Sequence, residues 1–385
     1  MVSELSRKPR ILLAHRTMAS SLASAASLVP AGAALRARAR APRRAARAAP
    51  VRASGATYDE VFDGATGQMI QTLSQSTETV SAGGLEWSYR LGVPEEGVEA
   101  QPHKVVLVHG AGLLAFTYSK LMRELQTQGY VCVAPDMPGH GATSKPPPAS
   151  FAYDLPAYQN ALSEFLDALA LGSEGDSPID LVVSGFFTSQ AALLFAAANP
   201  DRVRRVCVLN APLGNGHKLP DPLAVYGRPF GMGKGANADV YKLAYFGNEF
   251  AIDPERMGVY EAPYVGPDAA AARDAFEATA TATSLKDATS AVTAALSKGG
   301  RGAQKVRVVW GSADKYLGDA PMYKWCEDVR ASFDVMRKVG HMPQEDFAEE
   351  TAKFASAFFQ SEGRVGALGS VRLGKIGKDD DYDRS

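Results

Sequence analysis

The segment DLVVSGFFTSQAALLFAAANP (residues 180–200) combines an apolar run, a short turn and an alanine-rich stretch. The β-branched and apolar residues 181–183 predict a strand that is buried on both faces. Residues 188–198 favour a helix, because alanine and leucine have high helix propensity. A buried strand followed by a helix is typical of a mostly parallel sheet covered by helices. The turn between them contains Gly185 and Phe186.

The same alternation of strand and helix patterns recurs along the chain, which predicts an α/β fold with a mostly parallel central sheet flanked by helices. Further strands are expected in KVVLVHG (104–110), YVCVAP (130–135), RVRRVCVLNAP (202–212) and QKVRVVWGSAD (304–314). Helices are expected in DLPAYQNALSEFLDALAL (154–171) and TAKFASAFFQ (351–360), where apolar residues recur at helical spacing.

The first 53 residues hold eleven Lys and Arg but a single acid, and they are rich in Ser and Ala. This composition is typical of an organelle transit peptide. We expect import into the plastid stroma, with the mitochondrion as the alternative, and a start at Met18 rather than Met1 remains open. A disordered basic arm and a nucleic-acid-binding tail are the other interpretations of such a segment.

The rest of the chain carries 30 basic and 41 acidic residues, so its formal net charge is −11. This charge disfavours nucleic-acid binding. No window approaches the roughly 20 apolar residues of a transmembrane helix, so we expect no spanning segment. Cys132, Cys207 and Cys326 are widely separated and indicate no disulfide framework and no metal site. No cofactor motif is present, and a small molecule is the expected substrate or ligand.

The strand pattern stops between residues 212 and 291 and resumes afterwards. Such an interruption predicts a mainly helical cap inserted over the carboxyl edge of the sheet, where ligand crevices of these folds lie. We expect the domain organisation to be as follows: transit peptide 1–53, lead-in 54–90, first part of the core 91–211, cap 212–291, second part of the core 292–360 and disordered tail 361–385.

Six motifs agree with one family in type and order: LVHGAG (107–112), APDMPGHGATSKP (134–146), the elbow segment, MGVYEAPYVGPDA (257–269), VVWGSADKYLG (308–318) and VGHMPQEDF (339–347). From about residue 91 to residue 359 the chain resembles the α/β-hydrolases, in the branch of haloalkane dehalogenases and epoxide hydrolases. It is most similar to plastid-targeted plant and algal members in which the elbow nucleophile is replaced. The resemblance implies an α/β-hydrolase fold.

The resemblance also implies a general base and its acidic partner. His341 occupies the position of the base, and Asp314, 27 residues earlier, that of the acid which orients it. Asp319 is a weaker substitute for the acid. His109 belongs to a tight turn rather than to the chemistry, and the loop around Asp136 has a structural role, together with Gly139, His140 and Gly141.

The nucleophile itself is missing. Counting from the strand places Gly185 at the nucleophile position, whereas counting back from the helix end places Phe186 there, the register that we prefer. Neither side chain can attack a substrate. The turn after the first buried strand is expected to present the N–H of Ala111 to an oxyanion, with the N–H of Phe187 as the second donor. Dehalogenation is disfavoured, because Gly185 and Ala111 stand where that chemistry needs Asp and Asn.

Three functions remain open. The protein acts on or binds a small hydrophobic molecule through the His341 and Asp314 pair without a covalent nucleophile; it is a catalytically inactive ligand-binding or scaffold protein; or, least favoured, it is a serine esterase. A displaced nucleophile would be Ser184 or Ser189, although a strand-end hydroxyl and a helix cap explain these residues as well. The cap residues Tyr260 and Tyr264 either line the pocket or pack.

Overall fold

The computed structural model describes residues 56, 58–63, 67–173, 175–236, 239–245, 252–266, 269–297 and 305–361. The predicted transit peptide and all but the first residue of the predicted tail lie outside the described residues. Everything described below belongs to one compact unit of the chain.

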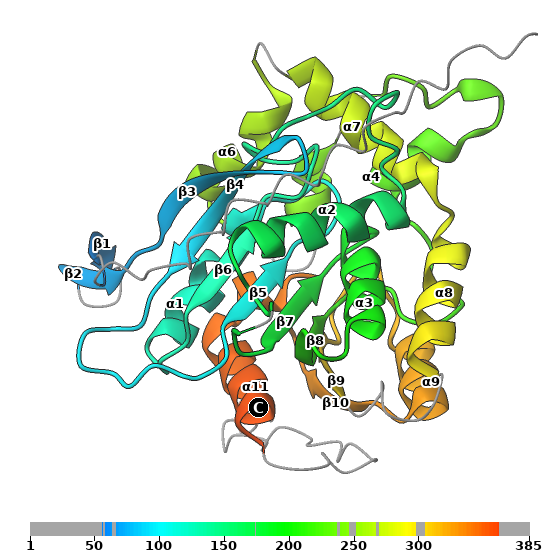
Figure 1. Cartoon of the computed structure of the whole chain (residues 1–385). Helices are drawn as coiled ribbons and strands as arrows, with labels where there is room; N and C mark the ends of the chain where they lie inside the picture. Colours follow the sequence, from blue (N-terminus) through cyan, green and yellow to red (C-terminus); the bar gives the residue numbers. More distant parts are fainter. Residues whose placement is uncertain are drawn as a thin grey trace, which may run out of the picture. The chain divides into compact units, whose positions relative to one another are not determined.

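An eight-stranded sheet forms the centre of this unit, and its first six strands are parallel (Figure 1). The last two strands run antiparallel to their neighbours. Along the sheet the strands are β10 (Ser332–Met336), β9 (Val306–Gly311), β8 (Val203–Leu209), β7 (Ile179–Ser184), β5 (Val105–Val108), β6 (Cys132–Pro135), β4 (Leu85–Gly92) and β3 (Ser76–Ala82). The fold class predicted from the sequence is therefore confirmed.

Alternate residues of the central strands face two helical layers, as the pleat of a strand requires. Val105 and Leu107 pack toward α1 (Ser119–Gln126) and α11 (Ala348–Gln360). Val106 and Val108 belong to the opposite core, which includes residues of α2 (Leu155–Ala168) and α3 (Thr188–Ala198). Both faces of the central strands β5, β6 and β7 are buried, which explains their continuous apolar runs.

The sheet begins earlier than residue 91, where the sequence places the start of the core. Strands β3 and β4 lie in the predicted lead-in, joined by a turn at Gly83 and Gly84, both with positive φ. Strand β3 is partly exposed, so it lacks the apolar run that marks a buried strand. A separate hairpin is formed by β1 (Tyr58–Asp63) and β2 (Gln68–Leu73).

The inserted cap contains four α-helices among its described residues: α4 (Asp221–Ala224), α5 (Val240–Tyr245), α6 (Pro254–Glu261) and α7 (Ala269–Ala282). The next helix, α8 (Leu285–Ser297), crosses the predicted cap boundary at 291 and packs on α3 and α9 (Asp319–Val329). A hydrogen bond of 3.0 Å from Trp325 Nε1 to Thr293 Oγ1 holds α8 on α9, so α8 packs on the core. None of the described helices is long and apolar enough to cross a membrane.

Candidate functional site

The candidate site lies at the carboxyl edge of the parallel strands. His341 follows β10, Asp314 follows β9, the elbow follows β7 and Ala111 follows β5. Because parallel strands end at the same edge of a sheet, these loops converge although they are far apart in the sequence.

His341 and Asp314 are in direct contact. The distance from His341 Nδ1 to Asp314 Oδ2 is 2.8 Å, and both side chains are buried. Asp314 also accepts the backbone N–H groups of Tyr316 at 2.7 Å and Leu317 at 3.1 Å. Burial by itself would raise the pKa of Asp314, but the charge and hydrogen bond of His341 and the other donors outweigh it and lower that pKa. An ionised Asp314 fixes the imidazole in the tautomer that carries the proton on Nδ1.

Asn210 is a site residue to which the sequence analysis assigned no role. It follows β8, is fully buried, and its Nδ2 donates to Asp314 Oδ2 at 2.8 Å. The same amide bonds both backbone groups of Gly311, at 2.7 and 3.0 Å, so it ties the end of β8 to the end of β9. A polar residue ending the apolar run VCVL was the available signal. Asp319 Oδ1 accepts the N–H of Trp310 Nε1 at 2.8 Å. The expectation that Asp319 could replace Asp314 as the acid is therefore wrong.

The elbow has a backbone that neither sequence register predicts. Strand β7 ends at Ser184 and α3 begins at Thr188, so three residues form the turn. Gly185 has φ +74°, and Phe187 has φ +63° and ψ −65°. A side chain in this left-handed region is unfavourable for any residue except glycine. The residue with a strained backbone is therefore Phe187 and not Phe186. The register that places the elbow position at Phe186 is wrong about where the strain lies.

The expected oxyanion donors are not free. The carbonyl oxygen of Phe186 accepts the N–H of Ala111 at 2.8 Å and the N–H of Thr188 at 2.9 Å. The N–H of Phe187 donates to Gln190 Oε1 at 2.5 Å. The expectation for Ala111 and Phe187 is thus wrong, because the turn folds its own carbonyl and a helix side chain onto these donors.

The ring of Phe186 covers the imidazole of His341. The two rings are stacked, with 5.5 Å between their centroids and an interplanar angle of 28°. Both residues are almost fully buried, with 1% and 2% of their surface exposed. The ring of Tyr316 meets the imidazole edge-on, 5.3 Å away. His341 is therefore enclosed by aromatic side chains.

Neither candidate serine is bonded to His341. Ser184 Oγ lies 2.9 Å from Tyr118 Oη and accepts a long bond of 3.5 Å from Gln344 Nε2. Ser189 Oγ donates to the carbonyl of Gly185 at 2.5 Å, back along the chain, rather than capping the helix. Both hydroxyls are buried and engaged, so the structure does not support a displaced nucleophile.

The loops around the site are held by buried polar groups. His109 Nδ1 lies 2.8 Å from the carbonyl of Gly110, and His109 Nε2 accepts the N–H of Met137 at 3.0 Å. Burial lowers the pKa of His109 to about 4, so the ring is neutral. Asp136 accepts the backbone N–H groups of Ala115 at 2.7 Å and Ala142 at 2.9 Å. These residues position the turn, as the sequence predicts.

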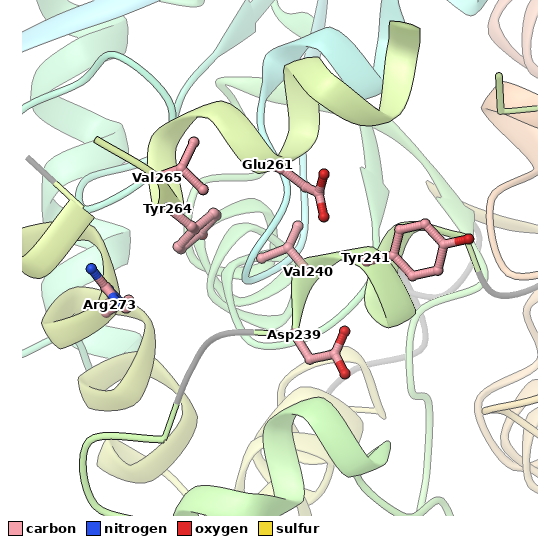
Figure 2. Close-up of a pocket in the computed structure, with 7 residues that line it drawn as sticks. All are labelled: Asp239, Val240, Tyr241, Glu261, Tyr264, Val265 and Arg273. Atoms are coloured by element: carbon pink, nitrogen blue, oxygen red, sulfur yellow. The ribbon is translucent and has the colours of Figure 1, made fainter. Parts of the chain in front are cut away.

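The two cap tyrosines differ in their surroundings. Tyr260 is buried and donates to Glu345 Oε1 at 2.5 Å, so it ties the cap to the short helix α10 (Pro343–Asp346) after His341. Tyr264 lines a cleft of about 280 Å³ within the cap, between α5, the end of α6 and α7 (Figure 2). The other lining residues are Asp239, Val240, Tyr241, Glu261, Val265 and Arg273. The hydroxyl of Tyr264 is itself buried and has no hydrogen-bond partner among the described residues.

The described residues contain no group of three or more His, Cys, Asp and Glu side chains that could hold a metal ion. The chain belongs to the alpha/beta hydrolase family, whose model matches residues 105–354.

Two curated proteins resemble parts of the chain. Cis-3-alkyl-4-alkyloxetan-2-one decarboxylase of Shewanella oneidensis is 33% identical over 132 residues, or 33% of this chain and 39% of the relative. A haloalkane dehalogenase of Psychrobacter cryohalolentis is 31% identical over 112 residues, 29% of this chain and 35% of the relative. The chain thus spans well under half the length of either relative.

Among solved structures, haloalkane dehalogenase DbeA of Bradyrhizobium elkani superposes with a TM-score of 0.55 at 18% identity, covering 74% of this chain and 99% of the other. The epoxide hydrolase CorEH superposes with a TM-score of 0.55 at 18% identity, covering 74% of this chain and 98% of the other. At this identity the likeness concerns the fold.

Proposed function

We propose that this member of the alpha/beta hydrolase family binds a small hydrophobic molecule without hydrolysing it. The observation that carries the proposal is the position of Phe186. Its carbonyl takes the N–H groups of Ala111 and Thr188, and its ring covers His341. Acyl transfer requires a nucleophile next to the base and donors free to stabilise an oxyanion. Neither requirement is met by this arrangement.

The cap supports an apolar ligand. A Cβ placed on Gly112 would lie 2.6 Å from side-chain atoms of both Leu243 and Phe276, so cap side chains reach into the turn after β5. A ligand held there would replace these contacts as the cap moves, and its apolar atoms would face leucine and phenylalanine. The curated relatives are named for reactions on alkyl oxetanones and haloalkanes, which are small and largely apolar. We propose the same class of molecule as the ligand.

The test uses the purified full-length chain. We expect no labelling by a fluorophosphonate probe and no turnover of p-nitrophenyl esters, epoxides or haloalkanes. Native mass spectrometry should instead detect a bound apolar molecule of low mass, released by organic solvent. Labelling at Ser184 or Ser189 that disappears in the corresponding Ser→Ala variant would overturn the proposal and restore the esterase.

A second candidate function is noncovalent catalysis with His341 as general base. Asp314, fixed by Asn210 and by two backbone N–H groups, supports it, because this arrangement orients an imidazole for proton transfer. If a substrate is found, His341→Gln should abolish its turnover while the protein still binds it. Unchanged turnover in His341→Gln would exclude this role.

We further propose that the protein is imported into plastids, which the Ser, Ala and Arg bias of residues 1–53 supports. A fluorescent protein carrying residues 1–53 should accumulate in the stroma of algal or plant cells and lose these residues. A cytosolic or mitochondrial signal would contradict the proposal, and changing the arginines of this segment to glutamate should abolish import.

A further inference from the structure

The cap exposes large apolar side chains on one short segment, residues 227–235, which we call the cap loop. Phe230 is 100% exposed and Met232 is 68% exposed. In Figure 1 the segment that follows α4 extends away from the sheet. A single exposed aliphatic residue needs no explanation, but a fully exposed aromatic next to an exposed methionine indicates an interaction site.

The backbone of the cap loop holds these side chains outward. Phe230 has φ +59° and ψ +22°, a left-handed conformation that is unfavourable for a residue with a side chain. Backbone hydrogen bonds close the turn, from Met232 N to the carbonyl of Pro229 and from Lys234 N to that of Gly231. Gly233 is buried against Val225, where an added Cβ would lie 1.7 Å from the carbonyl oxygen. The loop is thus anchored at its base while its tip is exposed.

Two cations flank the exposed apolar residues. Arg228 and Lys234 are both exposed. The carboxylate of Glu277 accepts the N–H of Gly235 at 2.9 Å, at the base of the loop. The tip therefore presents an aromatic ring and a thioether between two positive charges.

We propose that the cap loop docks this protein on an anionic lipid bilayer. Phe230 and Met232 enter the boundary between headgroups and acyl chains, where aromatic side chains are favoured. Although the chain after residue 53 has a net charge of −11, Arg228 and Lys234 form a local positive patch that contacts lipid phosphates at the surface. The small size of the patch favours a bilayer over a protein partner, because a stable protein interface buries about 1,000 Å² or more and needs a broader patch than two apolar side chains. The proposal does not depend on whether the site under the cap binds or turns over a ligand.

The experiment is co-sedimentation of the full-length chain with vesicles of phosphatidylglycerol, compared with vesicles of phosphatidylcholine. We expect F230S/M232S to partition onto the anionic vesicles roughly tenfold more weakly than the unaltered chain. R228E/K234E should show a similar loss. Salt at 0.5 M should also reduce binding of the unaltered chain, because it shortens the electrostatic screening length to about 4 Å. The basic residues 1–53 are common to all variants, so differences between variants report on the loop.

Tyr323→Ser is the matched control, because Tyr323 is also an exposed aromatic, at 37%, but lies on α9. It should bind like the unaltered chain. Equal binding of F230S/M232S and the unaltered chain would overturn the proposal, as would failure of the unaltered chain to bind anionic vesicles. Loss of a cross-linked protein partner in F230S/M232S, with vesicle binding unchanged, would show that the loop docks on a protein instead.

Discussion

Glu345→Ala is expected to lower the free energy of unfolding by about 3 kcal/mol or more, because it removes the buried acceptor of an ionic cluster. The Glu345 side chain is fully buried and forms ion pairs with Arg256 and, at 3.2 Å, with Lys120. It also accepts the hydroxyl of Tyr260 at 2.5 Å. Without the carboxylate, the side chains of Arg256, Lys120 and Tyr260 lose their shared acceptor at a site that excludes most water. Leaving buried donors without a partner costs more free energy than the lost attraction alone.

The same substitution should loosen the cap, because Arg256 and Tyr260 lie on α6 whereas Glu345 lies on α10 (Pro343–Asp346), just after His341. Urea unfolding of the full-length chain measures the stability, and limited proteolysis should show faster cleavage within the cap. Glu349→Ala is the control, because that side chain is 71% exposed and pairs with Lys353 one helix turn away. A loss below 1 kcal/mol for Glu345→Ala would show that the cluster does not hold the cap.

The sheet could be predicted because its central strands are buried on both faces and so have continuous apolar runs. The contact between His341 and Asp314 was expected from the resemblance to the α/β-hydrolases, and it forms because both residues follow parallel strands that end at one edge of the sheet. Strand β3 could not be recognised in the same way, because much of its surface is exposed. The pattern of apolar residues indicates which strands are buried, so it does not reveal a strand that is only partly buried.

The state of the site depends on features that residue types do not encode. The backbone angles of Gly185 and Phe187 determine which N–H groups the Phe186 carbonyl accepts. The amino-acid sequence alone was compatible with two registers of the elbow. The ion pair of Glu345 with Arg256 joins residues 89 positions apart, on elements whose packing the sequence does not give. The sequence predicts a replaced nucleophile, and it also predicts free N–H donors at Ala111 and Phe187, which the folded turn does not have.

Phe186→Ala is expected to expose His341 and to destabilise the protein by about 3 kcal/mol, the usual cost of removing a buried phenylalanine ring. The ring is 1% exposed and stacks on the imidazole, so its removal leaves a cavity beside His341. An apolar cavity left by a removed side chain binds small aromatic molecules. Indole should therefore raise the melting temperature of Phe186→Ala but not that of the unaltered chain, and diethyl pyrocarbonate should modify His341 faster in the variant.

Phe195→Ala separates these effects from destabilisation alone. Phe195 is 3% exposed and lies on α3, where its ring contacts the guanidinium of Arg202 rather than the candidate site. It should lose comparable stability without changing the reactivity of His341 or the effect of indole. If His341 reacts equally fast in the unaltered chain and in Phe186→Ala, the ring does not close the site, and the case against turnover would rest only on the occupied donors. If only Phe186→Ala gains reactivity, the ring is the barrier, and a natural ligand must displace it to reach the imidazole.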